Sequence, residues 1–226
     1  MHDGIQGLFP ADVVAVAMGD AGDVSALLTE EAACLGRSVP KRAQEFAAGR
    51  LCARRALLEF GVVNFPLRVG PQREPLWPEG YVGSITHTTG LCAAVVAERA
   101  RFSAIGVDVE IADRVKQELW PHICVAAEIA WLDSLPESQR VAAATLIFAA
   151  KEAFYKAQFP LVRERLDFHD VCVEASNWNG TRGACRLRPL RPLMVSAFVT
   201  LPLLAQYRYK GEFVAAGVIA LASNSP

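Results

Sequence analysis

Apolar residues recur at helical spacing in two long segments of the chain. From residue 40 to 60 they fall mostly three or four positions apart, and Gly61 stands where a helix C-terminus is expected. The segment 140–158 is likewise rich in apolar residues and is followed by Pro160. The pattern predicts two long helices, the second of which ends before Pro160.

Shorter apolar runs between these helices predict strands. VGSITH and LCAAVVAE are separated by a turn at Thr89-Gly90, which is typical of a hairpin, and AIGVDVEI predicts a further strand. The stretch from Gly70 to Gly83 is rich in proline and glycine and reads as a loop. Additional strands are expected at about 170–175, 184–188, 194–200 and 212–221.

A helix followed by antiparallel strands therefore occurs twice along the chain. This order favours an α+β fold built from two similar halves, 1–105 and 106–226. The length of 226 residues and a hydrophobic content of 52% are enough for one large domain or two small ones.

Charge and composition exclude several classes of protein. Lys and Arg number 23 against 24 Asp and Glu, so no broad positive field exists to hold nucleic acid or a membrane surface. No apolar run approaches the roughly 20 residues of a membrane-spanning helix, and the N-terminus lacks the basic region of a signal peptide. We therefore expect a cytoplasmic protein. Its cysteines should be reduced thiols that are buried and pack as small hydrophobic residues. The cysteines are Cys34, Cys52, Cys92, Cys124, Cys172 and Cys185.

Two carboxylates stand two positions apart in the predicted strand AIGVDVEI. Side chains alternate along a strand, so Asp108 and Glu110 project from one face while Val107 and Val109 project from the other. Two neighbouring anions on a half-buried strand repel each other, and Mg²⁺ is a cation that paired carboxylates bind well. The alternative is an edge strand whose acids face water.

Four polar side chains gather in KEAFYK, within an otherwise apolar helix. Glu152 and Lys156 are one turn apart on one face, and Lys151 and Tyr155 share a neighbouring face. Glu152 and Lys156 can be an ordinary surface ion pair. The apolar context equally favours a functional site, with Glu152 as a third carboxylate and the lysines facing phosphate.

Other polar residues suit the binding of an anionic ligand. His87, at the end of a predicted strand beside Thr86, can hold a phosphate oxygen or simply serve as a hydrogen-bonded structural residue. Arg42 and Arg50 lie on the first long helix, where arginines either clamp anions or only solvate the helix. Arg73 adds a candidate in the Pro-rich loop.

GVDVE and, some forty residues later, KEAFYK, preceded by GRLCARRAL and REPLWPEGYVGSITHTTG, resemble the motifs of the 4′-phosphopantetheinyl transferases. The similarity spans roughly residues 38–160 and is greatest to the Sfp-like type, in the branch of the enterobactin synthetase component D. It implies transfer of phosphopantetheine from coenzyme A to a serine of an apo-carrier protein, which releases adenosine 3′,5′-bisphosphate. It also implies a pseudo-dimeric fold with coenzyme A between the halves.

The resemblance further implies roles for individual side chains. Asp108, Glu110 and Glu152 match the acids that bind Mg²⁺, and Glu152 is also a candidate general base for the carrier serine. Lys156 matches the basic residue near the scissile bond and is, with Glu152, a candidate catalytic residue. The other candidate coenzyme A contacts are Arg42, Arg50, Arg73, Thr86, His87 and Lys151.

Two other functions compete with this hypothesis. A non-catalytic scaffold that binds coenzyme A has no need of three carboxylates, and a phosphotransferase that uses ATP has no GxxxxGK[ST] loop here to hold the nucleotide. The expected partners are acyl or peptidyl carrier proteins of polyketide, nonribosomal-peptide or siderophore synthesis. Two fused halves suggest a monomer.

Overall fold

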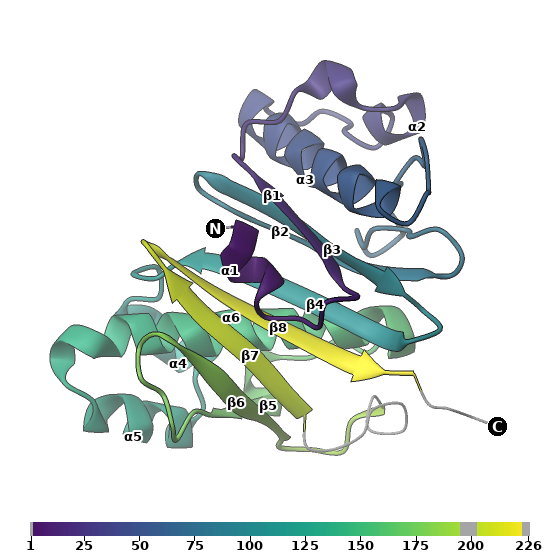
Figure 1. Ribbon diagram of the computed structural model, residues 1–226. Coiled ribbons are helices and arrows are strands. Elements are labelled where there is room, and N and C mark those ends of the chain that lie inside the picture. The colour runs from purple at the N-terminus through teal and green to yellow at the C-terminus, as the bar shows by residue number, and fades with distance from the viewer. Residues whose placement is uncertain (1, 195–202, 223–226) are drawn as a thin grey trace.

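The computed structural model describes residues 2–194 and 203–222, which form helices packed on antiparallel sheets (Figure 1). This arrangement confirms the predicted α+β class. The helices are α1 His2–Gln6, α2 Thr29–Ala32, α3 Pro40–Leu58, α4 Trp120–Ile123, α5 Ala126–Ser134 and α6 Glu137–Val162, with short 3-10 helices at Val24–Ala26, Gln117–Leu119 and Phe168–Asp170. The strands are β1 Val14–Met18, β2 Tyr81–Thr88, β3 Leu91–Glu98, β4 Phe102–Ile111, β5 Val171–Glu174, β6 Arg182–Pro189, β7 Leu203–Lys210 and β8 Phe213–Leu221.

The first half is a three-stranded sheet covered by α3. The strand order is β1-β3-β2, and the hairpin of β2 and β3 is the one predicted from the sequence. Cys52 and Ala53 of α3 pack with Leu67 and with Ala94 of β3, because the small side chains allow the helix to lie close to the sheet. Helix α3 follows Val39 with proline at its first position, as predicted for a helix start.

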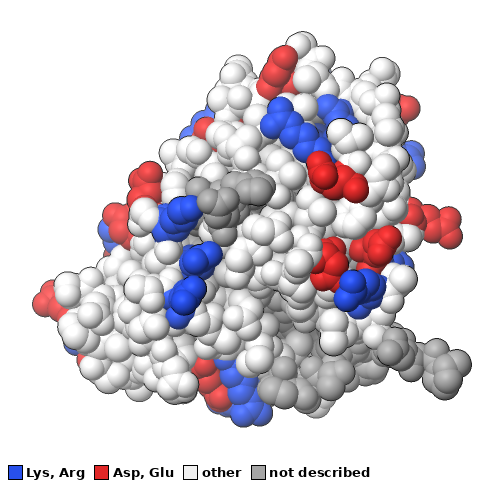
Figure 2. Space-filling model, in the orientation of Figure 1, with Lys and Arg blue, Asp and Glu red and all other residues white. Residues whose placement is uncertain are grey.

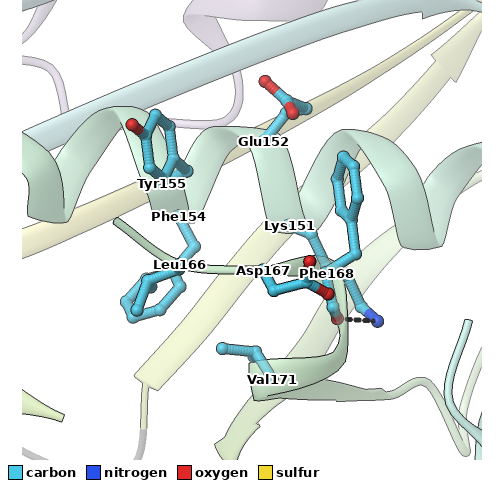
Figure 3. Close-up of a pocket in the computed structure, with 8 residues that line it drawn as sticks. All are labelled: Lys151, Glu152, Phe154, Tyr155, Leu166, Asp167, Phe168 and Val171. Carbon is cyan, nitrogen blue, oxygen red and sulfur yellow. Dashed lines mark hydrogen bonds between the residues drawn. The ribbon is translucent and has the colours of Figure 1, made fainter. Parts of the chain in front are cut away.

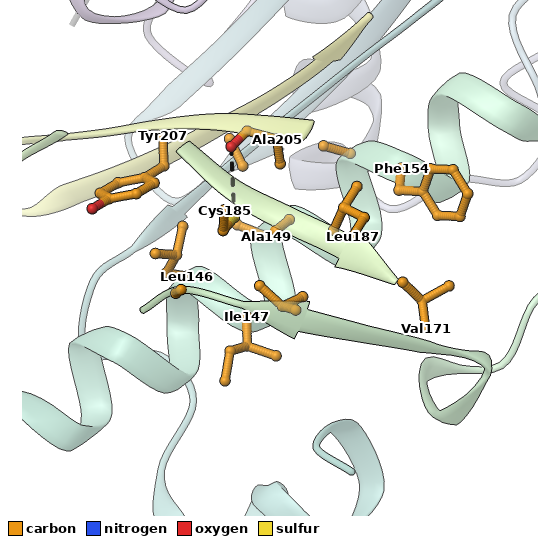
Figure 4. Close-up of a cluster of buried hydrophobic side chains, with 14 of the residues drawn as sticks. Leu146, Ile147, Ala149, Phe154, Val171, Cys185, Leu187, Ala205 and Tyr207 are labelled. Atoms are coloured by element: carbon orange, nitrogen blue, oxygen red, sulfur yellow. Dashed lines mark hydrogen bonds between the residues drawn. The ribbon is translucent and has the colours of Figure 1, made fainter. Parts of the chain in front are cut away.

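The second half is a five-stranded sheet with α6 along one face. Its strand order is β4-β8-β7-β6-β5, and every neighbouring pair is antiparallel. Leu146 and Ile147 of α6 belong to the same buried cluster as Cys185 and Leu187 of β6 and Tyr207 of β7 (Figure 4). Each fully buried Leu or Ile contributes about 1.5–3 kcal/mol to folding.

Gly106 allows α6 to cross β4 in close contact. A Cβ at this position would lie 1.9 Å from the carbonyl oxygen of Ala153, so any other residue would push the helix away. Since side chains alternate along β4, Asp108 lies on the same face as Gly106 and faces the helix. The close crossing thus places Asp108 beside the part of α6 that carries Glu152.

The sequence-based predictions differ from the structure at several places. Helix α6 continues past Pro160 to Val162 and ends at Arg163, whose left-handed backbone has φ 56° and whose N–H bonds to the carbonyl of Phe159. Proline is tolerated there because only one helical hydrogen bond is lost, in the final turn. The predicted strand 194–200 lies largely outside the described residues. Strands β1 and β7 and helices α4 and α5 were not foreseen.

The division into 1–105 and 106–226 remains a prediction, although the first sheet ends at Glu98 and the second begins at Phe102. All six cysteines are free thiols, and five are buried as expected, whereas Cys34 is exposed. Charged side chains on the face seen in Figure 2 form small separate groups of both signs. In the described ranges, no helix combines the length and apolar character needed to cross a membrane.

Candidate active site

A cleft of about 500 Å³ lies where the two halves of the chain meet. Asp108 and Glu110 reach it from β4, and Glu152 and Lys156 reach it from α6, so the two predicted motifs converge. Since β4 and α6 cross closely at Gly106, the convergence follows directly from the packing of the second half. The remaining lining residues are Lys41, Glu45, Ile85, His87, Thr88, Thr89, Arg114 and Phe148.

Asp108 is the best-anchored acid of the cleft. Its Oδ1 accepts hydrogen bonds from Nζ of Lys156 at 2.6 Å and from Oγ1 of Thr86 at 3.0 Å. Lys156 also donates to the carbonyl of Val107 at 3.3 Å. The other carboxylate oxygen, Oδ2, is buried and has no hydrogen-bond partner among the described residues. An anionic oxygen in that state is costly unless a ligand satisfies it.

The other two acids are shifted toward protonation. Burial, followed by the charge of Asp108, raises the pKa of Glu110 to about 7, although Arg114 lies 3.3 Å from its carboxylate and Thr88 donates to it at 3.1 Å. Burial likewise raises the pKa of Glu152. Three carboxylates thus share one partly desolvated cleft, and the charge of Asp108 adds to burial in disfavouring ionisation of the other two.

As the side chains stand, no group of three acidic, histidine or cysteine residues in the described ranges is close enough to hold one metal ion. The ammonium group of Lys156 lies against Oδ1 of Asp108, so its positive charge balances that carboxylate.

A row of hydroxyl groups on β2 holds the acidic strand in place. Oγ of Ser84 accepts the N–H of Val107 at 3.1 Å, and Oγ1 of Thr86 accepts the N–H of Val109 at 3.1 Å. Side chains of alternate residues in β2 thus bond to the backbone of β4. They take the place of the backbone-to-backbone hydrogen bonds that join strands within one sheet. In the sequence this row of hydroxyl groups is visible as the alternation S-x-T-x-T, from which its contact with β4 was not predicted. Thr86, predicted to contact coenzyme A, is buried, and its hydroxyl bonds to Asp108 and Val109 of β4.

His87 and Arg42 meet at the edge of the cleft. Nη1 of Arg42 lies 3.0 Å from Nε2 of His87, and because a guanidinium only donates, Nε2 accepts. Partial burial and the charge of Arg42 lower the pKa of His87. Glu45 lies 3.5 Å from both side chains. Lys41, Glu45 and Arg114 also line the cleft, although the sequence analysis did not select them.

An apolar pocket of about 220 Å³ adjoins the cleft and shares Ile85 and Lys156 with it. Trp77 forms one wall, and Tyr155 and Phe159 of α6 form another. Gly83 lies beneath Trp77, whose ring a Cβ would meet at 2.5 Å. Arg73, which the sequence predicted as a coenzyme A contact, lines this pocket and not the cleft.

Lys151 does not face the cleft, contrary to the sequence-based prediction. Its Nζ donates to the carboxylate of Glu128 at 2.7 Å and to the carbonyls of Ile123 and Phe168 at 2.9 and 2.8 Å. Figure 3 shows Lys151 and Glu152 leaving α6 in different directions. All three ammonium hydrogens have acceptors, so Lys151 is a buried structural residue.

Arg50 is also absent from the residues that line the cleft and its adjoining pocket. Its Nε donates to the carbonyl of Leu67 at 3.2 Å, and its guanidinium lies 3.8 Å from the ring centre of Phe46. Burial lowers the pKa of Arg50 to about 10. Arg50, predicted to contact coenzyme A, is thus a buried side chain that bonds within the first half of the chain.

Comparison with known families agrees with the motifs. Residues 30–97 match the 4′-phosphopantetheinyl transferase N-terminal domain, and residues 104–212 match the 4′-phosphopantetheinyl transferase superfamily. The chain therefore belongs to the 4′-phosphopantetheinyl transferases, and it is a transferase of the holo-carrier-protein synthase type.

Individual relatives lie in the branch suggested by the sequence. The 4′-phosphopantetheinyl transferase PptT of Mycobacterium tuberculosis is 39% identical over 159 residues, which are 68% of this chain and 69% of the relative. Enterobactin synthase component D of Salmonella typhi is 40% identical over 121 residues, 52% of this chain and 48% of the relative. The holo-[acyl-carrier-protein] synthase of Thermotoga maritima superimposes with a TM-score of 0.41 and 21% identity, over 54% of this chain and 64% of that one.

Proposed function

We propose that this transferase takes phosphopantetheine from coenzyme A and attaches it to a serine of an apo-carrier protein, with Mg²⁺ as cofactor. The serine oxygen forms a bond to the phosphorus that bears the pantetheine, the pyrophosphate P–O bond breaks, and adenosine 3′,5′-bisphosphate leaves. The observation that carries the proposal is a charged cleft with three carboxylates and a lysine, which continues at Lys156 into an apolar pocket.

The donor set of the cleft suits a hard divalent cation. Asp108 has a buried oxygen without a hydrogen-bond partner among the described residues, and burial together with the charge of Asp108 raises the pKa of Glu110 and of Glu152. Carboxylate oxygens of this kind are ligands that Mg²⁺ prefers. Asp108, Glu110 and Glu152 would hold the ion once their side chains turned toward a common point in the cleft. Once bound, Mg²⁺ supplies positive charge that offsets the charge of the pyrophosphate.

Other residues of the cleft suit the remaining tasks of the reaction. Lys156 is positioned between the cleft and the apolar pocket, where its ammonium can stabilise charge that develops on the transferred phosphate. Glu152 lies in the same cleft as Lys156, and burial raises its pKa above the usual value, which suits a side chain that accepts the proton of the carrier serine. Arg42 and His87 at the edge of the cleft suit phosphate groups of coenzyme A other than the one that is transferred.

The apolar pocket supports the choice of coenzyme A over ATP as donor. Trp77, Tyr155 and Phe159 offer a surface for an uncharged chain, which ATP lacks and pantetheine provides. Pantetheine carries apolar methyl groups and two amides, so it can bury surface there while the pyrophosphate stays beside Lys156.

A direct test incubates the protein with coenzyme A, Mg²⁺ and a panel of apo-carrier domains from fatty-acid, polyketide, nonribosomal-peptide and siderophore synthesis. Mass spectrometry should show the gain of one phosphopantetheine on at least one carrier. Siderophore carriers belong in the panel because one relative is named an enterobactin synthase component. Binding of coenzyme A without any mass gain would favour the scaffold instead.

Metal binding has a readout that is independent of activity. Mg²⁺ should raise the melting temperature of the wild type, because a ligand that binds only the folded state stabilises it. Asp108→Asn should abolish that increase. An equal increase in both proteins would place the ion elsewhere.

A further inference from the structure

A polar clasp connects the loop 70–75 of the first half to the C-terminal end of α6 in the second. Nη1 of Arg163 donates to Oε1 of Glu74, and Nη2 of Arg165 donates to Oε1 of Gln72. The paired residues are about ninety positions apart in sequence, so these contacts exist only in the folded chain. Both lie beside the apolar pocket, which Gln72 and Glu74 help to line.

The loop is folded around the carboxylate of Glu74, which is 8% exposed. Its Oε2 accepts the N–H of Gln72 at 2.9 Å, and its main-chain carbonyl accepts the N–H of Gly70 at 2.8 Å. A Cβ at Gly70 would lie 2.4 Å from the carboxylate, so the chain passes as close to it as glycine permits. A change at this carboxylate must therefore alter the loop.

The other partner of the clasp contacts the opposite wall of the pocket. The guanidinium of Arg163 lies 5.5 Å from the ring centre of Phe159, and that ring stacks on Tyr155 with centres 5.4 Å apart. Phe159 and Tyr155 both line the pocket. The contacts therefore run from the loop, through Arg163, into the aromatic wall formed by α6.

From this arrangement we propose that Glu74 and Arg163 are a pair of positioning residues that fix the distance between the two walls of the apolar pocket. The pair would thereby set the affinity for the pantetheine part of the donor. This inference rests on the proposed use of coenzyme A. Neither residue is among those that line the acidic cleft, so neither is assigned a part in the chemical step.

If the clasp positions the pocket, its loss should change the affinities for two related ligands by different factors. Coenzyme A contains pantetheine, whereas adenosine 3′,5′-bisphosphate lacks it. Arg163→Gln should weaken the binding of coenzyme A several-fold, with about tenfold as the upper bound if the full contribution of one hydrogen bond to a charged group is lost from the bound state. The same variant should bind adenosine 3′,5′-bisphosphate as the wild type does. In turnover, KM for coenzyme A should rise by a similar factor while kcat changes less than about twofold.

Three further variants make the test specific. Arg163→Lys keeps the charge and should recover most of the affinity. Glu74→Gln and the double variant Glu74→Gln/Arg163→Gln should resemble Arg163→Gln, because residues of one ion pair are not additive. Arg188→Gln is the matched control, since Arg188 pairs with Glu174 on the other sheet, away from the pocket. It should leave the binding of both ligands unchanged. Arg163 is exposed, so its replacement should not prevent folding.

The role of the clasp and the proposed function would be contradicted by different results. If Arg163→Gln binds coenzyme A like the wild type, or loses both ligands equally, the clasp does not position the pocket. If the wild type itself neither binds nor uses coenzyme A, the proposed function fails, and this inference fails with it.

Discussion

Thr86 donates its hydroxyl hydrogen to Oδ1 of Asp108 at 3.0 Å, across the boundary between the two sheets. The same hydroxyl oxygen accepts the N–H of Val109 at 3.1 Å. A single buried threonine therefore fixes both the backbone of the acidic strand and the direction of its first carboxylate. A side chain that the motif suggested as a ligand contact therefore orients an acid that lines the cleft.

Thr86→Val should damage stability and catalysis together. Valine has nearly the same shape, but it leaves the N–H of Val109 and one bond of Asp108 without a partner, at a cost of about 1–3 kcal/mol. Urea unfolding should show this loss, and the transfer rate should fall because Asp108 can rotate. Thr86→Ser keeps the hydroxyl and serves as the control. A valine variant as stable as the wild type would contradict the role given to this hydroxyl.

Glu152→Gln should separate catalysis from folding. No side-chain hydrogen bond of Glu152 to a described residue is seen, and burial already disfavours its charge, so the neutral amide should not lower the melting temperature. Loss of a general base and metal ligand should reduce kcat at least about 100-fold. Glu137→Gln, an exposed change at the start of the same helix, is the matched control and should remain active.

Lys151 and Lys156 should give opposite phenotypes, although only five positions separate them. Lys151→Met leaves the carboxylate of Glu128 buried and unpaired, which should lower the free energy of unfolding by about 3–5 kcal/mol. Below its melting temperature, that variant should keep the wild-type KM for coenzyme A. Lys156→Met should reduce kcat about 100-fold. Its loss of stability should be smaller than that of Lys151→Met, because the side chain of Lys156 is 27% exposed against 3% for Lys151, and Thr86 still donates to Asp108. Denaturant titrations measure the stability of both variants, and steady-state kinetics measure their catalysis. A raised KM for coenzyme A in Lys151→Met would support the original prediction that Lys151 contacts coenzyme A.

An ion-pair cluster around Arg191 should make stability fall at acid pH. Hydrogen bonds from Arg191 lower the pKa of Glu164 and of Asp170 below their usual values of 4.5 and 3.8. A carboxylate with a lowered pKa in the folded state stabilises the fold above its unfolded pKa, and that contribution disappears as the pH falls through the folded pKa. Arg191→Gln should therefore be less stable than the wild type at pH 7, and the difference should shrink as the pH falls below the usual carboxyl pKa values of 4.5 and 3.8. Thermal unfolding across this range measures it, and a gap that stays constant with pH would argue against the linkage.

Local pattern was sufficient for the parts of the chain that depend on neighbours in sequence. Alternation along β4 placed Asp108 and Glu110 on one face, and helical spacing placed Glu152 and Lys156 on another. The hairpin of β2 and β3 and most of α6 followed from the same two periodicities. The pairing of both motifs also sufficed to indicate the family, which the comparisons confirm.

Contacts between distant segments decided the remainder. Periodicity gives the direction of a side chain around its own element, but it does not say which neighbour covers that direction. Lys151 thus faces Glu128 instead of the cleft, and Arg50 faces Leu67. The clasp of Glu74 and Arg163 joins segments that nothing in local sequence connects. The sequence determined the chemistry available on each strand and helix. Only the packing of α6 across Gly106 of β4, within the second half, brought the two motifs together, because the proximity of side chains from distant segments arises when helix and sheet pack against each other.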